Sequence, residues 1–203
     1  MAAPLEGIRV VEVANYVAAP SVGALMADLG ADVIKVEPPG GEVMRGVLNA
    51  AGEVPGVNFL FELENRGKRS VIVDLNSARG PEVVHRLLDN GDILLTNLIA
   101  SRQAKYGLSA DEVRGRHPRV IHVSVTGYGT NGPDAGRPGF DYSAFWARSG
   151  IMGLVGHPGQ PPVLSRVAQG DHTTGMNALA ATLAALRVRD QTGEGQVVEV
   201  TLQ

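Results

Sequence analysis

Short β-branched runs alternate with amphipathic segments along the whole chain, and this alternation restricts the fold more than any other feature of the sequence. Residues 7–13 (GIRVVEV) and 32–37 (DVIKVE) are typical of buried strands, and residues 20–30 between them have apolar side chains at helical spacing. Strands that are apolar on both faces pair in parallel and are covered by helices on both sides. The sequence therefore predicts an α/β fold with a doubly wound, mostly parallel, Rossmann-like sheet.

The same alternation continues to the end of the chain. Two of the predicted helices are followed by a glycine, Gly30 and Gly91, at a place that favours a residue with positive φ. Ser109 and Glu112 form the Ser-x-x-Glu pattern of a capping box. We expect further strands at residues 70–75, 92–97, 120–125 and 196–202, and further helices at residues 80–90, 109–116, 141–150 and 173–189.

The composition excludes several classes of protein. The 203 residues include 18 basic and 21 acidic side chains, and the net charge of −3 gives no electrostatic signature of nucleic-acid binding. Cysteine is absent, so no disulfide framework and no thiol nucleophile are available, and a cytoplasmic location is expected. We expect no secretory signal, because the N-terminus lacks a basic segment followed by an apolar one. We expect no membrane span, because the uncharged, mostly apolar stretch at residues 172–186 is short and contains Thr and Asn.

Common nucleotide-binding and hydrolase motifs are missing from the sequence. The first expected strand-to-helix loop, residues 14–23, lacks G-x-G-x-x-G, and Walker A, G-x-S-x-G and H-E-x-x-H are absent as well. The small residues of this loop fit either an ordinary tight connection or a ligand that approaches the backbone. The five histidines have no metal-ligand spacing, so we expect no metal site.

Two local patterns each allow a structural and a functional interpretation. Residues 65–69 (NRGKR) place three cations in a turn, which is either a solvated surface turn or a clamp for phosphate. Gly170-Asp171 comes just before the long predicted helix, so the Asp171 carboxylate is expected either to cap that helix or to act as an oriented, ionised nucleophile.

Taken together, six ordered motifs make the chain resemble the family III CoA-transferases, the group of formyl-CoA transferase and carnitine CoA-transferase, which also contains α-methylacyl-CoA racemase. The resemblance runs from end to end. The motifs are PLEG at residues 4–7, LGADVIKVE at 29–37, NRGKRS at 65–70, PRVI at 118–121, GYG at 127–129, and GD at 170–171 together with TGEGQ at 192–196.

The resemblance implies a reaction and a nucleophile. In this family the aspartate that matches Asp171 attacks an acyl-CoA thioester and forms an acyl-aspartyl anhydride and free CoA thiolate. The thiolate returns to give an aspartyl-CoA thioester, and a carboxylic acid acceptor then takes over the CoA. The implied partners are therefore an acyl-CoA and a free carboxylic acid, with coenzyme A as part of the substrate and no metal.

The resemblance also implies where CoA binds and which relatives fit less well. Formyl-CoA transferase has Gln and Arg at the positions of Val17 and Pro38, which argues against oxalyl and formyl substrates. The racemases have a catalytic His at the position of Phe140, so a two-base proton exchange has less support. The implied CoA contacts are Val17, Ala18, Val73, Asp74, Leu75, Asn76, Asn97, Leu98, Lys105, Arg137, Gly139 and Phe140.

Members of the family are about twice as long as this chain. The resemblance therefore implies that residues 1–203 are the Rossmann-like, CoA-binding portion of the large domain with the catalytic aspartate, and that the small domain and the C-terminal part are absent. Two full-length chains interlock in this family, so a homodimer is expected. The alternatives are an acyl-CoA racemase and a catalytically silent CoA-binding fragment.

Overall fold

Six strands form one sheet in the computed structural model, which describes residues 2–47 and 57–203. The strands are β1 (Arg9–Val13), β2 (Asp32–Glu37), β3 (Arg69–Ile72), β4 (Ile93–Thr96), β5 (Ile121–Thr126) and β6 (Val197–Thr201). Every neighbouring pair is parallel, and the order across the sheet is β3-β2-β1-β4-β5-β6. The predicted doubly wound sheet is confirmed, and the chain reverses its direction across the sheet between β1 and β4.

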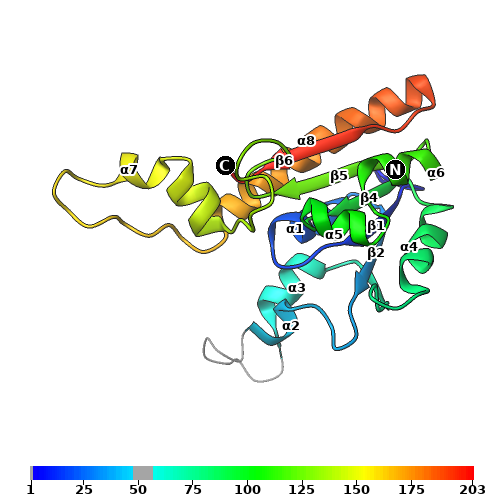
Figure 1. Cartoon of the computed structure of the whole chain (residues 1–203), viewed down its shortest axis with the longest axis horizontal. Helices are drawn as coiled ribbons and strands as arrows, with labels where there is room; N and C mark the ends of the chain where they lie inside the picture. Colours follow the sequence, from blue (N-terminus) through cyan, green and yellow to red (C-terminus); the bar gives the residue numbers. More distant parts are fainter. Residues whose placement is uncertain (1, 48–56) are drawn as a thin grey trace.

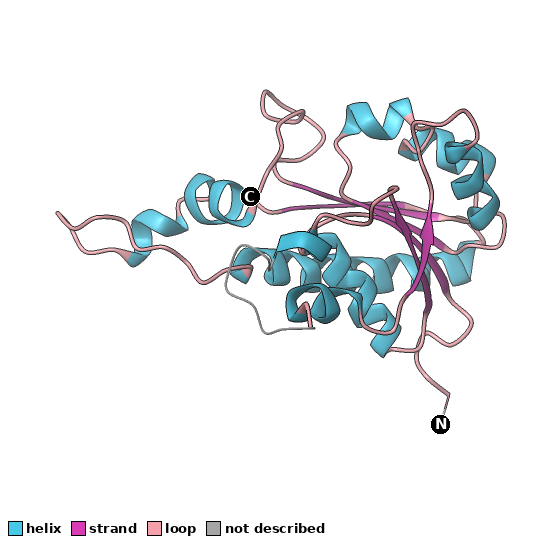
Figure 2. Cartoon of the chain, turned by 90° about the horizontal axis from the view of Figure 1, so that it is seen from below, coloured by secondary structure: helices cyan, strands magenta, loops and turns pink. Residues whose placement is uncertain are grey.

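Helices cover both faces of this sheet, as Figures 1 and 2 show. Neighbouring residues of β1 point to opposite faces, so Val10 packs in the core under α1 and α8 while Val11 packs in the core under α4 and α6. The helices are α1 (Ala18–Asp28), α2 (Met44–Val47), α3 (Phe59–Asn65), α4 (Gly80–Leu88), α5 (Ala100–Lys105), α6 (Ala110–Arg116), the π-helix η2 (Asp141–Arg148), α7 (Ile151–Val155) and α8 (Gln169–Thr192). Four of them, α2, α3, α5 and α7, have four to seven residues and were not predicted.

The predicted helix ends are partly confirmed. Gly30 has a φ of 98°, and Ser109 and Glu112 form the reciprocal hydrogen bonds of a capping box. The prediction of a positive φ at Gly91 is wrong. A β-carbon at Gly91 would lie 3.2 Å from the Leu88 Cα, so the residue is small because the last turn of α4 packs closely against it.

A cluster of four buried charges joins the first strands below the β1–α1 loop. Lys35 Nζ lies 2.8 Å from Glu12 Oε1, and Lys68 Nζ lies 2.7 Å from Glu12 Oε2. Glu42 completes the cluster with its Oε2 3.8 Å from Lys35 Nζ. All four side chains are at most 2% exposed. Charges in such a setting are tolerated only as a balanced set, because the apolar surroundings do not replace their hydration.

The cluster corrects both interpretations of residues 65–69. Lys68 is buried on Glu12, and it also donates to the Pro20 carbonyl at 2.8 Å. Arg66 pairs with Asp28 at the surface, and Arg69 pairs with Asp32. The segment is therefore neither a simple solvated turn nor a phosphate clamp, because each of its three cations forms an ion pair with a carboxylate of this chain.

Replacement of Lys68 tests the buried cluster. Lys68→Met leaves Glu12 with only Lys35 and is expected to lower the free energy of unfolding by about 3 kcal/mol, the usual scale for breaking a buried pair. Arg66→Met is the matched control in the same segment and is expected to cost about 0–1 kcal/mol, since its ion pair is solvated. Urea unfolding of both variants measures the difference. Equal losses would contradict a structural role for the cluster.

Candidate active site

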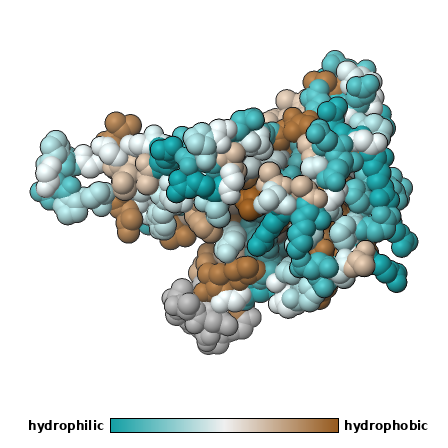
Figure 3. Space-filling view, viewed as in Figure 1, coloured by the Kyte–Doolittle hydropathy of each residue, from teal (hydrophilic) through white to brown (hydrophobic). Residues whose placement is uncertain are grey.

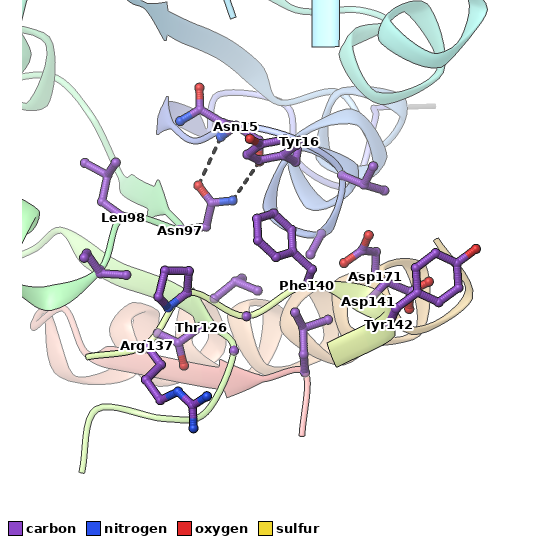
Figure 4. Close-up of a pocket in the computed structure, with 18 of the residues that line it drawn as sticks. Asn15, Tyr16, Asn97, Leu98, Thr126, Arg137, Phe140, Asp141, Tyr142 and Asp171 are labelled. Carbon is purple, nitrogen blue, oxygen red and sulfur yellow. Dashed lines mark hydrogen bonds between the residues drawn. The ribbon is translucent and has the colours of Figure 1, made fainter. Parts of the chain in front are cut away.

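A cavity of about 450 Å³ opens at the carboxyl ends of the strands. Its walls are the residues that follow β1, β4, β5 and β6, together with η2 and the beginning of α8 (Figure 4). It therefore lies beside the point where the strand order reverses, which is where open parallel sheets bind their ligands. Apolar and aromatic side chains make up most of its wall, and two carboxylates, Asp141 and Asp171, face it.

The β1–α1 loop forms one wall of the cavity and is held by contacts from three other segments. The Asn15 N–H donates to Asn97 Oδ1 at 3.0 Å, and the Asn97 amide donates back to the Asn15 carbonyl at 2.7 Å. The Tyr16 N–H donates to Glu42 Oε1 at 2.8 Å, and Lys35 donates to the Ala14 carbonyl at 3.1 Å. These bonds hold Tyr16 at a φ of 66°, a left-handed conformation that a tyrosine seldom adopts.

Two glycines bring the opposite wall into place. A β-carbon on Gly127, just after β5, would lie 2.5 Å from the Gly139 Cα, and one on Gly139 would meet Gly127 at 2.4 Å. The two backbones therefore touch in a way that only glycine allows. This contact places residues 137–140 beside the cavity. There the Phe140 ring packs edge to face on the Tyr16 ring, with 5.6 Å between the ring centroids.

Asp171 lies in the first turn of α8, because that helix begins at Gln169 and not at residue 173. The N-cap residue is Ala168, with a φ of 63°, so the interpretation of Asp171 as the helix cap is wrong. Partial burial raises the pKa of Asp171 to about 6, and the nearby negative charge of Asp141 adds to the rise while His172 opposes it. The side chain is thus a carboxylate that gains little from its surroundings when it is ionised.

The structure brings eight of the thirteen expected site residues to the cavity. These are Val17, Ala18, Asn97, Leu98, Arg137, Gly139, Phe140 and Asp171. The other five are Val73, Asp74, Leu75, Asn76 and Lys105, and they lie outside it. Two of these still meet each other, since Lys105 Nζ donates to Asn76 Oδ1 at 2.6 Å.

Several residues that line the cavity were missed in the sequence. Asn15 and Thr126 lie at the carboxyl ends of β1 and β5, so the rule that ligands bind there could have found them. Asp141 follows Phe140 at the start of η2, and nothing in its local sequence sets it apart from a helix-capping acid. Tyr16 carries no local signal for its positive φ.

A partly buried carboxylate beside an apolar cavity, at the reversal point of a doubly wound sheet, is typical of α/β proteins that bind a ligand at the strand ends. The sequence model of the family described as CoA-transferase family III matches residues 5–203 of this chain. The chain belongs to this family of CoA-transferases.

Individual relatives agree with this assignment. The chain is 38% identical over 201 residues to the (R)-2-hydroxy-4-methylpentanoate CoA-transferase of Clostridioides difficile, covering 98% of this chain and 50% of that protein. It is 40% identical over 205 residues to the succinate–glutarate CoA-transferase of Agrobacterium fabrum, covering 98% of this chain and 51% of that protein. The crystal structure of a CaiB/BaiF family protein from Brucella suis superposes with a TM-score of 0.90 at 38% identity, covering 100% of this chain and 54% of that one. The chain thus spans about half the length of these relatives.

Two further properties concern the described residues only. None of their helices combines the length and the apolar character needed to cross a bilayer. They also contain no group of three or more His, Asp or Glu side chains that could hold a metal ion.

The raised pKa of Asp171 predicts that this carboxylate destabilises the fold near neutral pH. A pKa of about 6 in the folded chain, against 3.8 in the unfolded chain, means that the folded state binds more protons between these values. The penalty is complete above pH 6 and disappears below about pH 4. Asp171→Asn should therefore stabilise the protein by on the order of 1–3 kcal/mol at pH 7.5, and less as the pH falls.

Thermal unfolding at pH 7.5, 5 and 4 measures this effect. Asp190 is an exposed aspartate of the same helix, and Asp190→Asn is the control. Its unfolding temperature should differ little from that of the wild type at any of these pH values. A loss of stability for Asp171→Asn at pH 7.5 would show that the carboxylate makes stabilising contacts in the fold.

Proposed function

We propose that the protein transfers CoA from an acyl-CoA to a free carboxylic acid, with Asp171 as the covalent nucleophile. The observation that carries this proposal is the Asp171 carboxylate, partly buried, of raised pKa, and on the wall of an apolar cavity at the strand ends. A carboxylate that is poorly stabilised as an anion is a better nucleophile, and an apolar cavity excludes the water that would hydrolyse an anhydride.

The proposed reaction has four covalent steps. An oxygen of Asp171 bonds to the acyl carbon, the C–S bond breaks, and its electron pair leaves with the CoA sulfur as thiolate. The thiolate attacks the aspartyl carbon of the anhydride and releases the first acid as a carboxylate. The acceptor carboxylate then attacks the aspartyl carbon of this thioester, and its C–S bond breaks to give a second anhydride and the CoA thiolate. The thiolate attacks the acceptor's acyl carbon, and the C–O bond to Asp171 breaks to release its carboxylate. Asp171 is free again at the end.

Charge and shape suggest how the thioester lies in the cavity. Arg102 lines the cavity and can attract the phosphates of CoA, and Arg137 lines it with its guanidinium 2.8 Å from Asp134 Oδ1. In Figure 4 Arg137 and Asp171 lie on opposite sides of Phe140. The thioester is then expected near Asp171, with the Phe140 ring beside the acyl chain. Lys105 and Asn76, which meet outside the cavity, are proposed as contacts for the distal adenosine end.

The transferase reaction also fits the identity of residue 140 better than racemisation. Phe140 has no group that exchanges a proton, and its ring packs against Tyr16. Racemisation at the α-carbon of an acyl-CoA needs an acid and a base on opposite sides of that carbon. Phe140 offers no second base at the position where the racemases have histidine.

A trapping experiment tests the nucleophile. The protein is incubated with an acyl-CoA and hydroxylamine, and the peptide that contains Asp171 is examined by mass spectrometry for an aspartyl hydroxamate. We expect the hydroxamate in the wild type and its loss, with at least a 10³-fold loss of CoA exchange, in Asp171→Asn. Circular dichroism of this variant controls for folding. Near-wild-type exchange by Asp171→Asn would rule out the covalent mechanism.

We further propose that the protein acts in the cytoplasm and that it forms a homodimer. Support for the homodimer comes from large apolar side chains on the segment that projects from the sheet at the left of Figure 1, where Leu154 is 85% and Leu164 73% exposed. Hydrophobic side chains are also visible on this projection in Figure 3. Exposed apolar groups that cluster in this way are typical of interfaces.

Light scattering across a concentration series tests the association. The expected result is a dimer for the wild type and weaker self-association, by roughly tenfold, for Leu154→Glu, because a charge would be buried in the interface. Thr173→Glu, an exposed position on α8, is the control. A wild-type protein that stays monomeric at all concentrations would contradict the proposal.

A further inference from the structure

Asp141 is a second carboxylate at the cavity, and the reaction proposed above leaves it without a role. It is the first residue of η2 and is only 6% exposed. Its Oδ1 accepts the Gly170 N–H at 2.7 Å, and its Oδ2 is buried without a hydrogen-bond partner among the described residues. A buried carboxylate oxygen without a partner is costly, so its presence calls for a physical explanation.

The Gly170 contact joins η2 to the turn that carries Asp171. A β-carbon on Gly170 would lie 2.1 Å from the Phe145 ring, so the backbone of α8 rests directly on η2. The hydrogen bond from Gly170 to Asp141 fixes this backbone one residue before Asp171. The two carboxylates therefore face the same cavity from two elements that are held rigidly together (Figure 4).

Among the charged groups around Asp171, Asp141 has no positively charged partner in the part of the chain that the structure describes. Three groups act on Asp171: Asp141 from η2, Glu64 from α3, and its neighbour His172. His172 Nε2 lies 2.7 Å from Glu64 Oε1, so a charged His172 is offset by Glu64. No ion pair to Asp141 occurs within the ranges that the structure describes. Its negative charge therefore acts on Asp171 through a poorly hydrated region.

We propose that Asp141 is a positioning residue for the nucleophile, which orients the first turn of α8 through Oδ1 and repels the Asp171 carboxylate through its own charge. This proposal rests on the function proposed above. When the Asp171 oxygen bonds to the acyl carbon and the C–S electron pair leaves with sulfur, Asp171 loses its charge. The repulsion between the two carboxylates is relieved in that step, so Asp141 favours formation of the covalent intermediate over the free carboxylate.

Asp141→Asn separates the charge of Asp141 from its hydrogen bond. The amide oxygen of Asn can still accept the Gly170 N–H, while the negative charge is lost. Carbon-13 NMR of the side-chain carboxyl groups, on the protein without substrate, is expected to show the Asp171 titration midpoint about one pH unit lower than in the wild type. The acid limb of the pH profile for Asp171 acylation should move by the same amount, with acylation at pH 7.5 slower by roughly tenfold.

Asp141→Ala is the comparison that removes the hydrogen bond as well. It should show the lower midpoint and a further loss of acylation, because the α8 turn is no longer fixed. An unchanged midpoint in Asp141→Asn would overturn the proposal and leave Asp141 as a cap for Gly170 only. A lower midpoint with no loss of acylation would overturn the role in the reaction.

A measurement on the wild type covers the case in which the variants do not fold. Because Asp141 and Asp171 line the same cavity, the carbon-13 chemical shift of the Asp141 carboxyl carbon should show an inflection where Asp171 ionises. The absence of this inflection would also overturn the proposal. Failure of the proposed function gives a different result: the inflection is present in the wild type, but no hydroxamate forms at Asp171.

Discussion

The buried charges of Glu12, Lys35, Glu42 and Lys68 are the interaction on which the site depends most. They come from β1, from β2, from the segment after β2 and from the segment before β3, and the two signs balance. Because removal of any one leaves an uncompensated charge in an apolar region, the four segments fit only in one arrangement. The same cluster supplies the acceptor for the Tyr16 N–H and the donor for the Ala14 carbonyl, so the wall of the cavity takes its shape from it.

The opposite side of the site is organised by close backbone contacts. Gly127 lies on Gly139, and Gly170 lies on the Phe145 ring, so the loop after β5, η2 and α8 form one closely packed unit. Asp171 is placed by this unit and not by a helix cap of its own. The cavity thus has two walls. The β1–α1 loop, which the buried charges hold in place, forms one wall. The glycine contacts position the other wall, which carries Asp171.

The sheet was predictable because it depends on short-range patterns, whereas much of the site was not. β-branched runs located all six strands, and periodicity, glycine-marked helix ends and a capping box located the helices α1, α4, α6, η2 and α8. Periodicity could not detect α2, α3, α5 and α7, because four to seven residues complete fewer than two helical turns.

The features of the site that escaped prediction arise from contacts between distant segments. Tyr16 and Ala168 have positive φ without being glycine, and long-range contacts hold Tyr16 in that conformation, as the Glu42 contact shows. Lys68 looked like a surface cation because its partner, Glu12, lies 56 residues earlier. Residue pattern alone left Asp171 as either a cap or a nucleophile; the family resemblance favoured the nucleophile, and the structure places Asp171 on the cavity wall.

The contact between Gly127 and Gly139 limits how the specificity of such a chain can change. No side chain fits at either position, so the path of the backbone around the cavity is the same whichever ligand enters it. Variation is left to the side chains that line the cavity, among them Tyr16, Phe140 and Tyr142, which are 41%, 52% and 40% exposed. With the acyl group in this cavity, as proposed above, new acyl preferences should arise by exchange of such side chains on an unchanged backbone, and a selection for altered substrates should return no changes at the two glycines.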